Sequence, residues 1–467
     1  MTAAALVAPP AAPGGFDVGE LVRTAPTPWR LRAALYAAWA LCFLLAAMGS
    51  LALSRAYYAM KTVGLDTAPS IIAAQEINSG LADLDANAGN YLLGAKAHQT
   101  AAMDTFEKRR SEITASLVKA AGNVTYGDSE RLPITTLFDG LGRYLELVSE
   151  ARYRKDIGDA VGAASLYGAA TDLMHQRLMP AADSLDATNR AHLDLDYREE
   201  QSRNLVGAVV AGFIAGALAL VLIAAQVYLA RKVRRIFNLP LLAATVLTVG
   251  YAVYLITRIT VARHDLRVAK EDAFESIHAM WKARALAYDA NGDETRYLLG
   301  GPRASSFEQA YHDKVQRLAT APQVADKVLN GILASKGLPA GYKGLFADEL
   351  GNLTFPGEGQ AALRMVRAFG EYDRLDQRMR TLERAGKHDQ AIDLCIGNGA
   401  DQSNAAFERF DKALHEVIKI NHEQFDATVK DGMRVLLVAG VVGPIASLVI
   451  ALLALFGLRP RIREYAA

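Results

Sequence analysis

Charged residues are missing from four long stretches of this sequence. Residues 33–53, 205–230, 238–257 and 435–458 contain no Asp, Glu, Lys or Arg. A helix rises about 1.5 Å per residue, so each stretch is long enough to cross a hydrocarbon layer of about 30 Å. The sequence therefore predicts four transmembrane helices. The same lack of charge argues against a channel or transporter, because conduction paths carry ionisable residues inside the membrane.

Cysteines and catalytic motifs are also scarce. Cys42 lies in the first apolar stretch and Cys395 in a polar block, so we expect no intrachain disulfide and no cysteine metal site. We find no phosphate-binding lysine loop, no Gly-x-Ser-x-Gly elbow and no kinase signature. His415 and His422 are seven residues apart, too far along a helix for one metal ion. We expect no catalytic, cofactor or metal site, and hence no enzyme.

Basic residues flank the apolar stretches and predict their orientation. The chain carries 51 Lys and Arg against 50 Asp and Glu, and no block is basic enough to predict nucleic-acid binding. Short basic segments stay in the cytosol. The predicted cytosolic segments are an unfolded arm (1–32), a turn (231–237) and a tail (459–467). The basic residues of the turn and the tail, which could also contact anionic lipid or an acidic partner, are Arg231, Lys232, Arg234, Arg235, Arg459, Arg461 and Arg463.

The two polar blocks, 54–204 and 258–434, then lie outside the cell. Both have helical spacing of apolar residues and no sustained two-residue alternation, so we expect no sheet. Tyr91-Leu92-Leu93-Gly94 recurs as Tyr297-Leu298-Leu299-Gly300. Asp85-Ala86-Asn87 resembles Asp289-Ala290-Asn291, with two extra residues before the second tyrosine. These matches predict an internal duplication. Together with the four apolar stretches, they predict an all-α membrane protein in which four transmembrane helices carry two duplicated extracytoplasmic four-helix bundles.

Helix lengths within a block predict a four-helix head on a two-helix stalk. Gly94 and Gly158 would lie at the far tip of the first head, with Gly300 and Gly386 at the tip of the second. Polar residues gather near these tips and could bind a ligand or partner; the candidates are Asp85, Asn87, Tyr91, Asp289, Asn291 and Tyr297. We favour an exposed polar helix face for the acidic and amide residues, and packing within the heads for the two tyrosines.

Two asparagines fall on otherwise apolar helical stripes. Asn189 follows Leu185 by four residues, and Asn421 follows Val417 by four. A polar residue at such a position fixes helix register at some cost in stability. It could also loosen a helix that slides during signalling. Drift of the stripe toward solvent is an equal alternative.

Two membrane helices carrying an outward four-helix bundle resemble the sensory modules of bacterial chemoreceptors and histidine kinases. The likeness covers both blocks, although no kinase or methyl-accepting segment follows them here. A tandem pair without an output domain is similar to the actinobacterial membrane proteins that couple a glutamate- and aspartate-binding lipoprotein to a soluble Ser/Thr protein kinase. That resemblance implies a solute-binding lipoprotein outside, a cytosolic kinase or other regulator inside, and sensing of amino-acid availability.

The sequence thus predicts a multi-pass plasma-membrane signal relay with both termini in the cytosol. Its expected partners are the lipid bilayer, the extracytoplasmic binding protein and the cytosolic regulator, and a homodimer is left open. The alternative is a non-catalytic accessory or scaffold subunit of an envelope complex. A channel or transporter is the least favoured interpretation.

Overall fold

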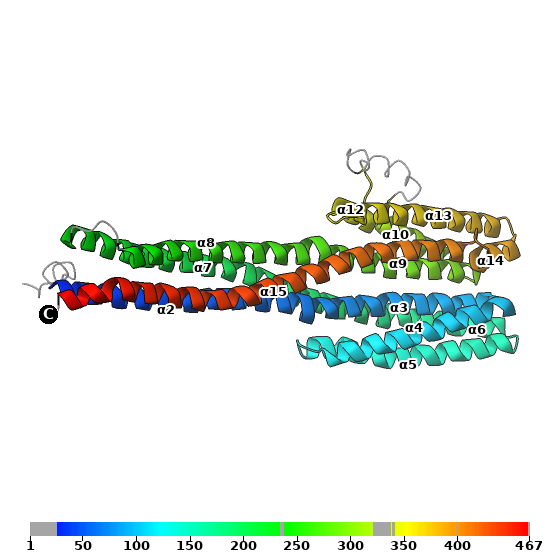
Figure 1. Ribbon diagram of the computed structural model, residues 1–467. Helices are drawn as coiled ribbons and strands as arrows, with labels where there is room; N and C mark the ends of the chain where they lie inside the picture. Colours follow the sequence, from blue (N-terminus) through cyan, green and yellow to red (C-terminus); the bar gives the residue numbers. More distant parts are fainter. Residues whose placement is uncertain (1–25, 234–237, 321–337, 339–340, 398, 466–467) are drawn as a thin grey trace, which may run out of the picture. The chain divides into compact units, whose positions relative to one another are not determined.

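A computed structural model describes residues 26–233, 238–320, 338, 341–397 and 399–465 (Figure 1). The described part is helical and contains no strand, as predicted. Its long helices and π-helical turns follow in chain order: α2 (Thr27–Lys61), η1 (Thr62–Thr67), α3 (Ala68–Leu93), α4 (Lys96–Gly122), α5 (Asp128–Asp156), α6 (Ala160–Leu173), η2 (Met174–Leu178), α7 (Met179–Val233), α8 (Leu239–Arg267), η3 (Val268–Phe274), α9 (Glu275–Leu298), α10 (Ala304–Leu318), α12 (Leu345–Gly351), α13 (Glu358–Arg384), α14 (His388–Ile396) and α15 (Ser403–Glu464).

Four helical stretches in the described residues are long and apolar enough to cross a membrane, in agreement with the four predicted spans. The chain divides into two compact units, of which the first contains residues 1–55, 203–260 and 436–467. In this membrane unit the indole nitrogen of Trp39 donates to the carbonyl of Ala451 over 3.1 Å. The amide nitrogen of Asn238 donates to the carbonyl of Gly457 over 2.8 Å. The Tyr251 hydroxyl packs against Gly443, and a Cβ at residue 443 would clash with this hydroxyl.

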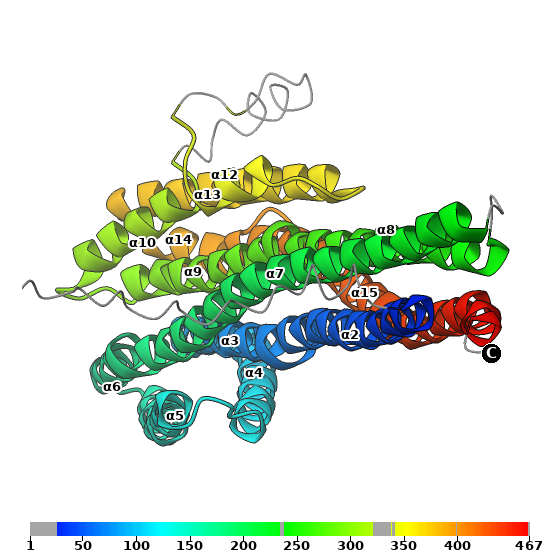
Figure 2. The same cartoon turned by 90° about the vertical axis from the view of Figure 1, so that its left-hand side faces the viewer.

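The second unit, residues 56–202 and 261–435, contains both polar blocks, and we call it the head. Bundle 1 is built from α3 to α6 and the start of α7; bundle 2 is built from α9 to α14 and the start of α15. In Figures 1 and 2, α3 and α9 lie side by side, with α4, α5 and α6 on the far side of α3 and α10 and α13 on the far side of α9. The two blocks therefore form one packed body.

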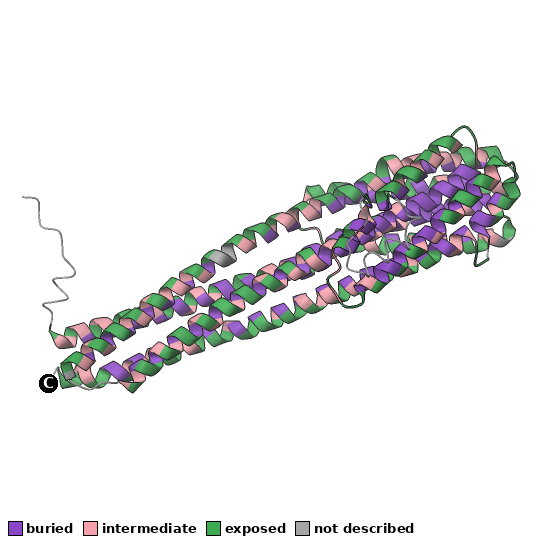
Figure 3. Ribbon diagram, turned by 90° about the horizontal axis from the view of Figure 1, so that it is seen from above, coloured by how far each residue is buried: buried purple, intermediate pink, exposed green. Residues whose placement is uncertain are grey.

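Burial follows from this arrangement. Most residues of α3 and α9 are buried, including polar ones, because each helix is covered by its own bundle and by the other bundle. Figure 3 shows the buried residues concentrated along the middle of the head. One apolar cluster joins Ile71 and Leu193 of bundle 1 to Phe274 and Phe410 of bundle 2. The bundles thus share a hydrophobic core.

Turn chemistry explains where the head helices end. Gly94 follows α3, as predicted, and accepts the extended conformation that leads into α4. Gly158 and Gly386 have positive φ angles of 87° and 73° directly after α5 and α13. That region of φ costs a residue with a Cβ and costs glycine little. The predicted turns are therefore found in both bundles.

The fourth helices of the bundles differ. In bundle 1, α6, η2 and α7 follow one another without a gap. In bundle 2, α14 ends at Ile396 and α15 begins at Ser403. Part of the connection between α10 and α13 lies outside the described residues, and its described part contains the short helix α12. The basic residues Arg234 and Arg235 also lie outside the described residues.

Several contacts recur at matching positions of the two bundles. The amide nitrogen of Asn123 donates to the Asp66 carbonyl and the Ser70 hydroxyl, and that of Asn352 donates to the Asp272 carbonyl and the Ser276 hydroxyl. The Glu130 carboxylate accepts two backbone N–H groups at the start of α5, and the Glu358 carboxylate does the same at the start of α13. Both bundles also place a π-helical turn before their first helix.

These contacts correct the alignment of the two blocks. Asp66 precedes Tyr91 by the same number of residues as Asp272 precedes Tyr297. No residues are therefore inserted between them, and the two extra residues expected from the sequence are wrong. Asp83 corresponds to Asp289, and Asp85 corresponds to Asn291. The short motif Asp-Ala-Asn had matched in the wrong register.

Candidate functional site

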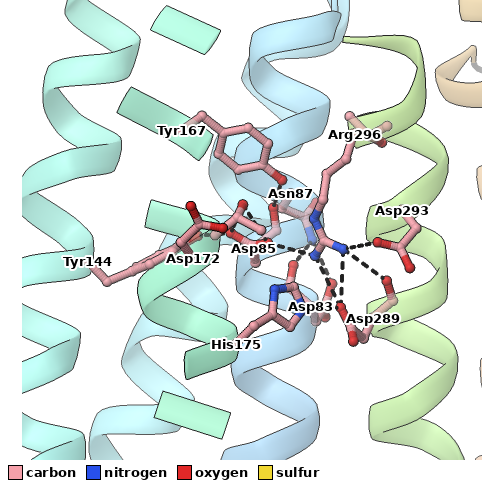
Figure 4. A network of polar contacts seen from close by, with 12 residues as sticks. Asp83, Asp85, Asn87, Tyr144, Tyr167, Asp172, His175, Asp289, Asp293 and Arg296 are labelled. Carbon is pink, nitrogen blue, oxygen red and sulfur yellow. Dashed lines mark hydrogen bonds and ion pairs between the residues drawn. The ribbon is translucent and has the colours of Figure 1, made fainter. Parts of the chain in front are cut away.

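Asp85 of α3 lies at the centre of a polar network inside the head (Figure 4). Its carboxylate accepts a hydrogen bond from the Tyr144 hydroxyl at 2.9 Å and another from the Thr171 hydroxyl at 3.2 Å. The Tyr167 hydroxyl donates to the Asp85 backbone carbonyl at 3.0 Å. Gly89, one turn further along α3, allows this approach because a Cβ there would meet Tyr167 and Thr295. Two other helices of bundle 1, α5 and α6, thus hold Asp85 in place.

Arg296 of α9 reaches Asp85 from bundle 2. Its Nη2 lies 2.7 Å from Asp85 Oδ2 and 3.2 Å from Asp289 Oδ1. Its Nη1 donates to Asp293, one turn earlier on α9. Arg296 is only 2% exposed, and its Nε has no hydrogen-bond partner. A fork of donors facing several carboxylates is the geometry for which arginine is suited.

Lys314 and His175 complete the network. The Lys314 ammonium on α10 contacts Asp289 at 2.7 Å and also contacts Asp293. His175 lies in η2 of bundle 1, and its Nε2 is 2.8 Å from Asp289 Oδ1. The three carboxylates Asp85, Asp289 and Asp293 exceed the charges of Arg296 and Lys314 by one.

The surroundings fix the charge states of this network. Burial opposes ionisation of Asp289, but Lys314, the hydrogen bond from His175 and Arg296 together hold its pKa well below the ordinary value. Burial likewise opposes the charge on Arg296, but Asp293 and Asp85 raise its pKa well above the ordinary value. Burial and the nearby Asp85 carboxylate raise the pKa of Tyr144 well above its usual range. Tyr144 therefore stays a hydrogen-bond donor.

A second polar group is centred on Asp83, two residues before Asp85 on α3. Asp83 accepts from Arg109 of α4 and, at 2.6 Å, from the Asn87 amide nitrogen. Burial raises the pKa of Asp83 to about 6, although Arg109 opposes the shift. The Arg109 guanidinium also lies 6.0 Å from the ring centre of Tyr288 on α9. Asn87 thus belongs to a contact between the bundles.

Glu294 lies inside bundle 2. It is fully buried and accepts hydrogen bonds from the Ser403 hydroxyl at 3.0 Å and from the Asn291 amide at 3.2 Å. Burial and the nearby Asp376 raise its pKa well above the ordinary value. Asp376 accepts from Arg380 Nε at 2.9 Å, and burial raises the pKa of Asp376 to about 6. Asn291 therefore supports a buried acid.

The burial of these groups overturns one expectation. We favoured an exposed polar face for Asp85, Asn87, Asp289 and Asn291, but Asp85, Asp289 and Asn291 are buried and Asn87 is partly buried. The sequence suggests exposure because a polar face near a helix end usually meets solvent. Here the second bundle covers that face and supplies Arg296 as the counter-ion.

Tyr91 and Tyr297 pack inside the head, in agreement with the packing interpretation. The Arg152 guanidinium lies 5.0 Å from the Tyr91 ring centre, and the Arg380 guanidinium lies 4.7 Å from that of Tyr297. Arg152 and Arg380 occupy matching places before Gly158 and Gly386. The Tyr91 hydroxyl also donates to Asp156 at 3.0 Å. Each tyrosine thus stacks against an arginine near the end of its bundle.

Asn189 and Asn421 are buried on the apolar stripes of α7 and α15, so the stripes do not drift toward solvent. The Asn421 amide nitrogen donates to Glu358 at 2.7 Å and to the Val417 carbonyl at 3.1 Å. Neither asparagine's side-chain oxygen has a partner. A buried polar pair of this kind fixes the register of α15 against α13.

Further basic residues lie outside the head. Arg231 and Lys232 occupy the last turn of α7, and both are exposed. Arg459, Arg461 and Arg463 lie near the end of α15, where Arg461 pairs with Glu464 at 2.5 Å. No further contact distinguishes these residues as a site.

A cavity of about 470 Å³ lies beside the network, between α6 and the turn from α9 to α10. Tyr167 and Arg296 form part of its wall, and most of the other lining residues are apolar or glycine. We call it the α6–α9 cavity. Its size suits a small ligand, and anything bound there would contact both bundles.

Sequence reasoning located Asp85 and Asp289 but missed most of their partners. Arg296, Lys314, His175, Tyr144 and Thr171 come from five different helical segments. Their spacing in the chain carries no signal of the contact. One signal was available in the repeated Tyr-Leu-Leu-Gly motif. The residue directly before its tyrosine is the neutral Asn90 in the first block and the charged Arg296 in the second.

Comparison with known proteins identifies part of bundle 1. Residues 59–198 match the model of a family described as an actinobacterial sensor domain. The match contains Asp85, Tyr144 and His175, and it ends before Arg296. No curated protein and no solved structure matches the chain. The match supports a sensing role for this membrane protein.

Proposed function

We propose that this protein is a non-enzymatic transmembrane signal relay in a bacterial plasma membrane, with both termini in the cytosol. Its head senses an extracytoplasmic ligand or a ligand-loaded binding protein, in keeping with the resemblance to the glutamate- and aspartate-responsive system. A cytosolic partner, such as a Ser/Thr protein kinase, reads the result. The family match over residues 59–198 supports the sensing part of this proposal.

The observation that carries the relay is the buried bond between Arg296 and Asp85. It joins the first helices of two bundles that we attribute to one duplicated ancestor. Breaking a buried ion pair is costly, whereas repacking all its members together is less so. Packed cores change between discrete arrangements and resist smooth deformation. A ligand at one bundle would therefore shift both together.

The path toward the membrane is the second part of the proposal. Asn189 belongs to α7, which also contains the apolar residues 205–230. Asn421 belongs to α15, which also contains 435–458. We propose that displacement of these two helices passes the signal inward, and that their asparagines set the two registers between which the helices move.

Insertion of Gly-Gly tests this path. Inserted at Asn204 in α7 or at Arg434 in α15, it adds flexibility and rotates everything beyond it. The expected result is a head that still folds and a cytosolic response that is lost or fixed in one state. The matched control is the same insertion after Gly386, in a surface turn of the head where no atom crowds the glycine.

The measured quantity is the activity of the cytosolic enzyme that copurifies after crosslinking in native membranes, with and without the outside stimulus. Normal regulation by both helix insertions, at normal expression, would reject the relay. The alternative is an accessory or scaffold subunit of an envelope complex, and copurification with a transport or cell-wall machine would favour it.

A further inference from the structure

A second cavity, of about 640 Å³, lies elsewhere in the head, and we call it the acidic cavity. Its walls come from α7 of bundle 1 and from η3, α9 and α12 of bundle 2. Five carboxylates line it but only two permanently charged cations, Arg190 and Lys282. The carboxylates belong to Asp186, Glu271, Glu275, Asp348 and Glu349.

The two cations already face carboxylates. Arg190 pairs with Glu275 at 2.6 Å, and Lys270, which is not a lining residue, contacts Glu275 at 2.6 Å and Asp194 at 2.8 Å. Lys282 is attracted electrostatically to the carboxylates of Asp183 and Asp186. His278 is held between Asp186, at 2.9 Å from its Nε2, and Arg190 at its Nδ1. The positive groups are thus matched within the protein, and the remaining charge in the cavity is negative.

Glu349 of α12 is the unmatched group. It is 1% exposed, and no donor among the described residues makes a well-aligned hydrogen bond to its oxygens, although the Ser276 hydroxyl and the Glu358 carboxyl lie beside it. It lies close to Glu358, whose oxygens accept from Thr354, Phe355 and Asn421. Burial, reinforced by the Glu358 charge, raises the pKa of Glu349 to about 8. An unsatisfied buried carboxyl destabilises a fold unless something pairs with it.

The fold itself does not require this carboxyl. The backbone N–H of Asn352 donates to the Glu349 carbonyl, and at the matching place in bundle 1 the N–H of Asn123 donates to the Ala120 carbonyl. The ends of α4 and α12 therefore have the same backbone hydrogen bond. The residue that accepts it is Ala120 in bundle 1 and Glu349 in bundle 2. The glutamate is a feature of the acidic cavity alone.

We propose that the acidic cavity binds a small organic cation through a primary ammonium group, with Glu349 as the anchoring carboxylate. The ammonium supplies strong donors to the Glu349 carboxylate and neutralises the negative charge that Glu349 and Glu358 place side by side. The other carboxylates of the wall favour a cation over an anion. The assignment concerns binding alone and holds whether or not the chain relays a signal.

Calorimetry on the full chain in lipid nanodiscs tests this site. The probes are n-butylamine and putrescine, with 1,4-butanediol as the uncharged control. Both amines should bind and the diol should not. Glu349→Gln and Glu349→Ala should weaken binding about tenfold to a hundredfold, the range for one charged hydrogen-bonded contact. Glu423→Gln, on an exposed face of α15, should bind like the unaltered protein.

The pH dependence separates a specific site from general attraction to an acidic surface. Binding needs ionised Glu349, so affinity should rise as pH increases from 6.5 to 9, while alkylammonium groups stay charged up to about pH 10. The rise should be absent in Glu349→Gln. Failure of both amines to bind, or equal binding by Glu349→Gln and the unaltered protein, would overturn the assignment. In that case Glu349 is simply a buried, protonated acid.

Discussion

Arg296 and Asp85 belong to different bundles, yet Arg296 Nη2 and Asp85 Oδ2 lie 2.7 Å apart in the interior of the head, with side chains 1% and 0% exposed. Neither charge is tolerable there alone, because removing a single ion from water costs several kcal/mol. The pair therefore ties the stability of one bundle to the presence of the other.

Replacing Arg296 should destabilise the head strongly. Arg296→Ala leaves Asp85, Asp289 and Asp293 without their shared partner, and loss of one member of a buried pair costs about 3–5 kcal/mol. Thermal unfolding of the full chain, followed by circular dichroism, measures the effect. Arg303→Ala is the matched control, since its pair with Asp172 is half exposed and is worth at most about 1 kcal/mol. Equal losses in the two variants would argue against a buried network.

Acid should stabilise the head over a defined range. Burial raises the pKa of Asp83 and of Asp376 to about 6, against about 3.9 for an unfolded chain. Between these values the folded state binds more protons at Asp83 and Asp376, so their contribution to stability falls as pH rises from about 4 to 6. Glu349, with its pKa raised to about 8, continues the fall above pH 6. Asp289, whose pKa is lowered, loses its contribution only below about pH 4.

Unfolding midpoints at pH 4.5, 5.5 and 7 measure this slope. Asp83→Asn and Asp376→Asn should each reduce the change in unfolding free energy across this pH range, by on the order of 1–3 kcal/mol. Glu423→Gln should leave it unchanged. A midpoint that rises steadily from pH 4.5 to 7 would contradict the assigned directions.

The first block alone should be helical but weakly cooperative. In a soluble fragment of residues 58–201, α3 loses its contact with α9, and Asp85 loses Arg296. Circular dichroism of this fragment should show helix with a broad melting transition. Asp85→Asn should sharpen and raise that transition, because it removes the unpaired charge. A sharp transition in the unaltered fragment would mean that bundle 1 does not depend on bundle 2.

Cysteine labelling of intact cells tests the proposed topology. Ser129→Cys and Gly351→Cys, in the two bundles, should react with an impermeant maleimide from outside. Ala467→Cys, at a position outside the described residues, should react only after the membrane is permeabilised. The reason is that short basic segments stay in the cytosol. Labelling of Ala467→Cys in intact cells would invert the proposed orientation.

The sequence by itself determined the fold class. Four uncharged stretches predict helices long and apolar enough to cross a membrane, and the structure has four such helices. Periodic apolar residues predict the head helices, and Gly94, Gly158 and Gly386 mark their ends. These features are local, so a single chain segment contains the whole signal.

Only the tertiary structure decided what the polar residues of α3 and α9 do. Asp85 and Asp289 look like exposed residues in isolation, because the chain does not reveal that a second bundle covers them. Arg296 is distant from Asp85 in sequence, and the pairing arises only when the two bundles pack. Glu349 is likewise unremarkable until α12 is buried beside Glu358. Long-range packing sets burial, and burial sets the charge and partners of each group.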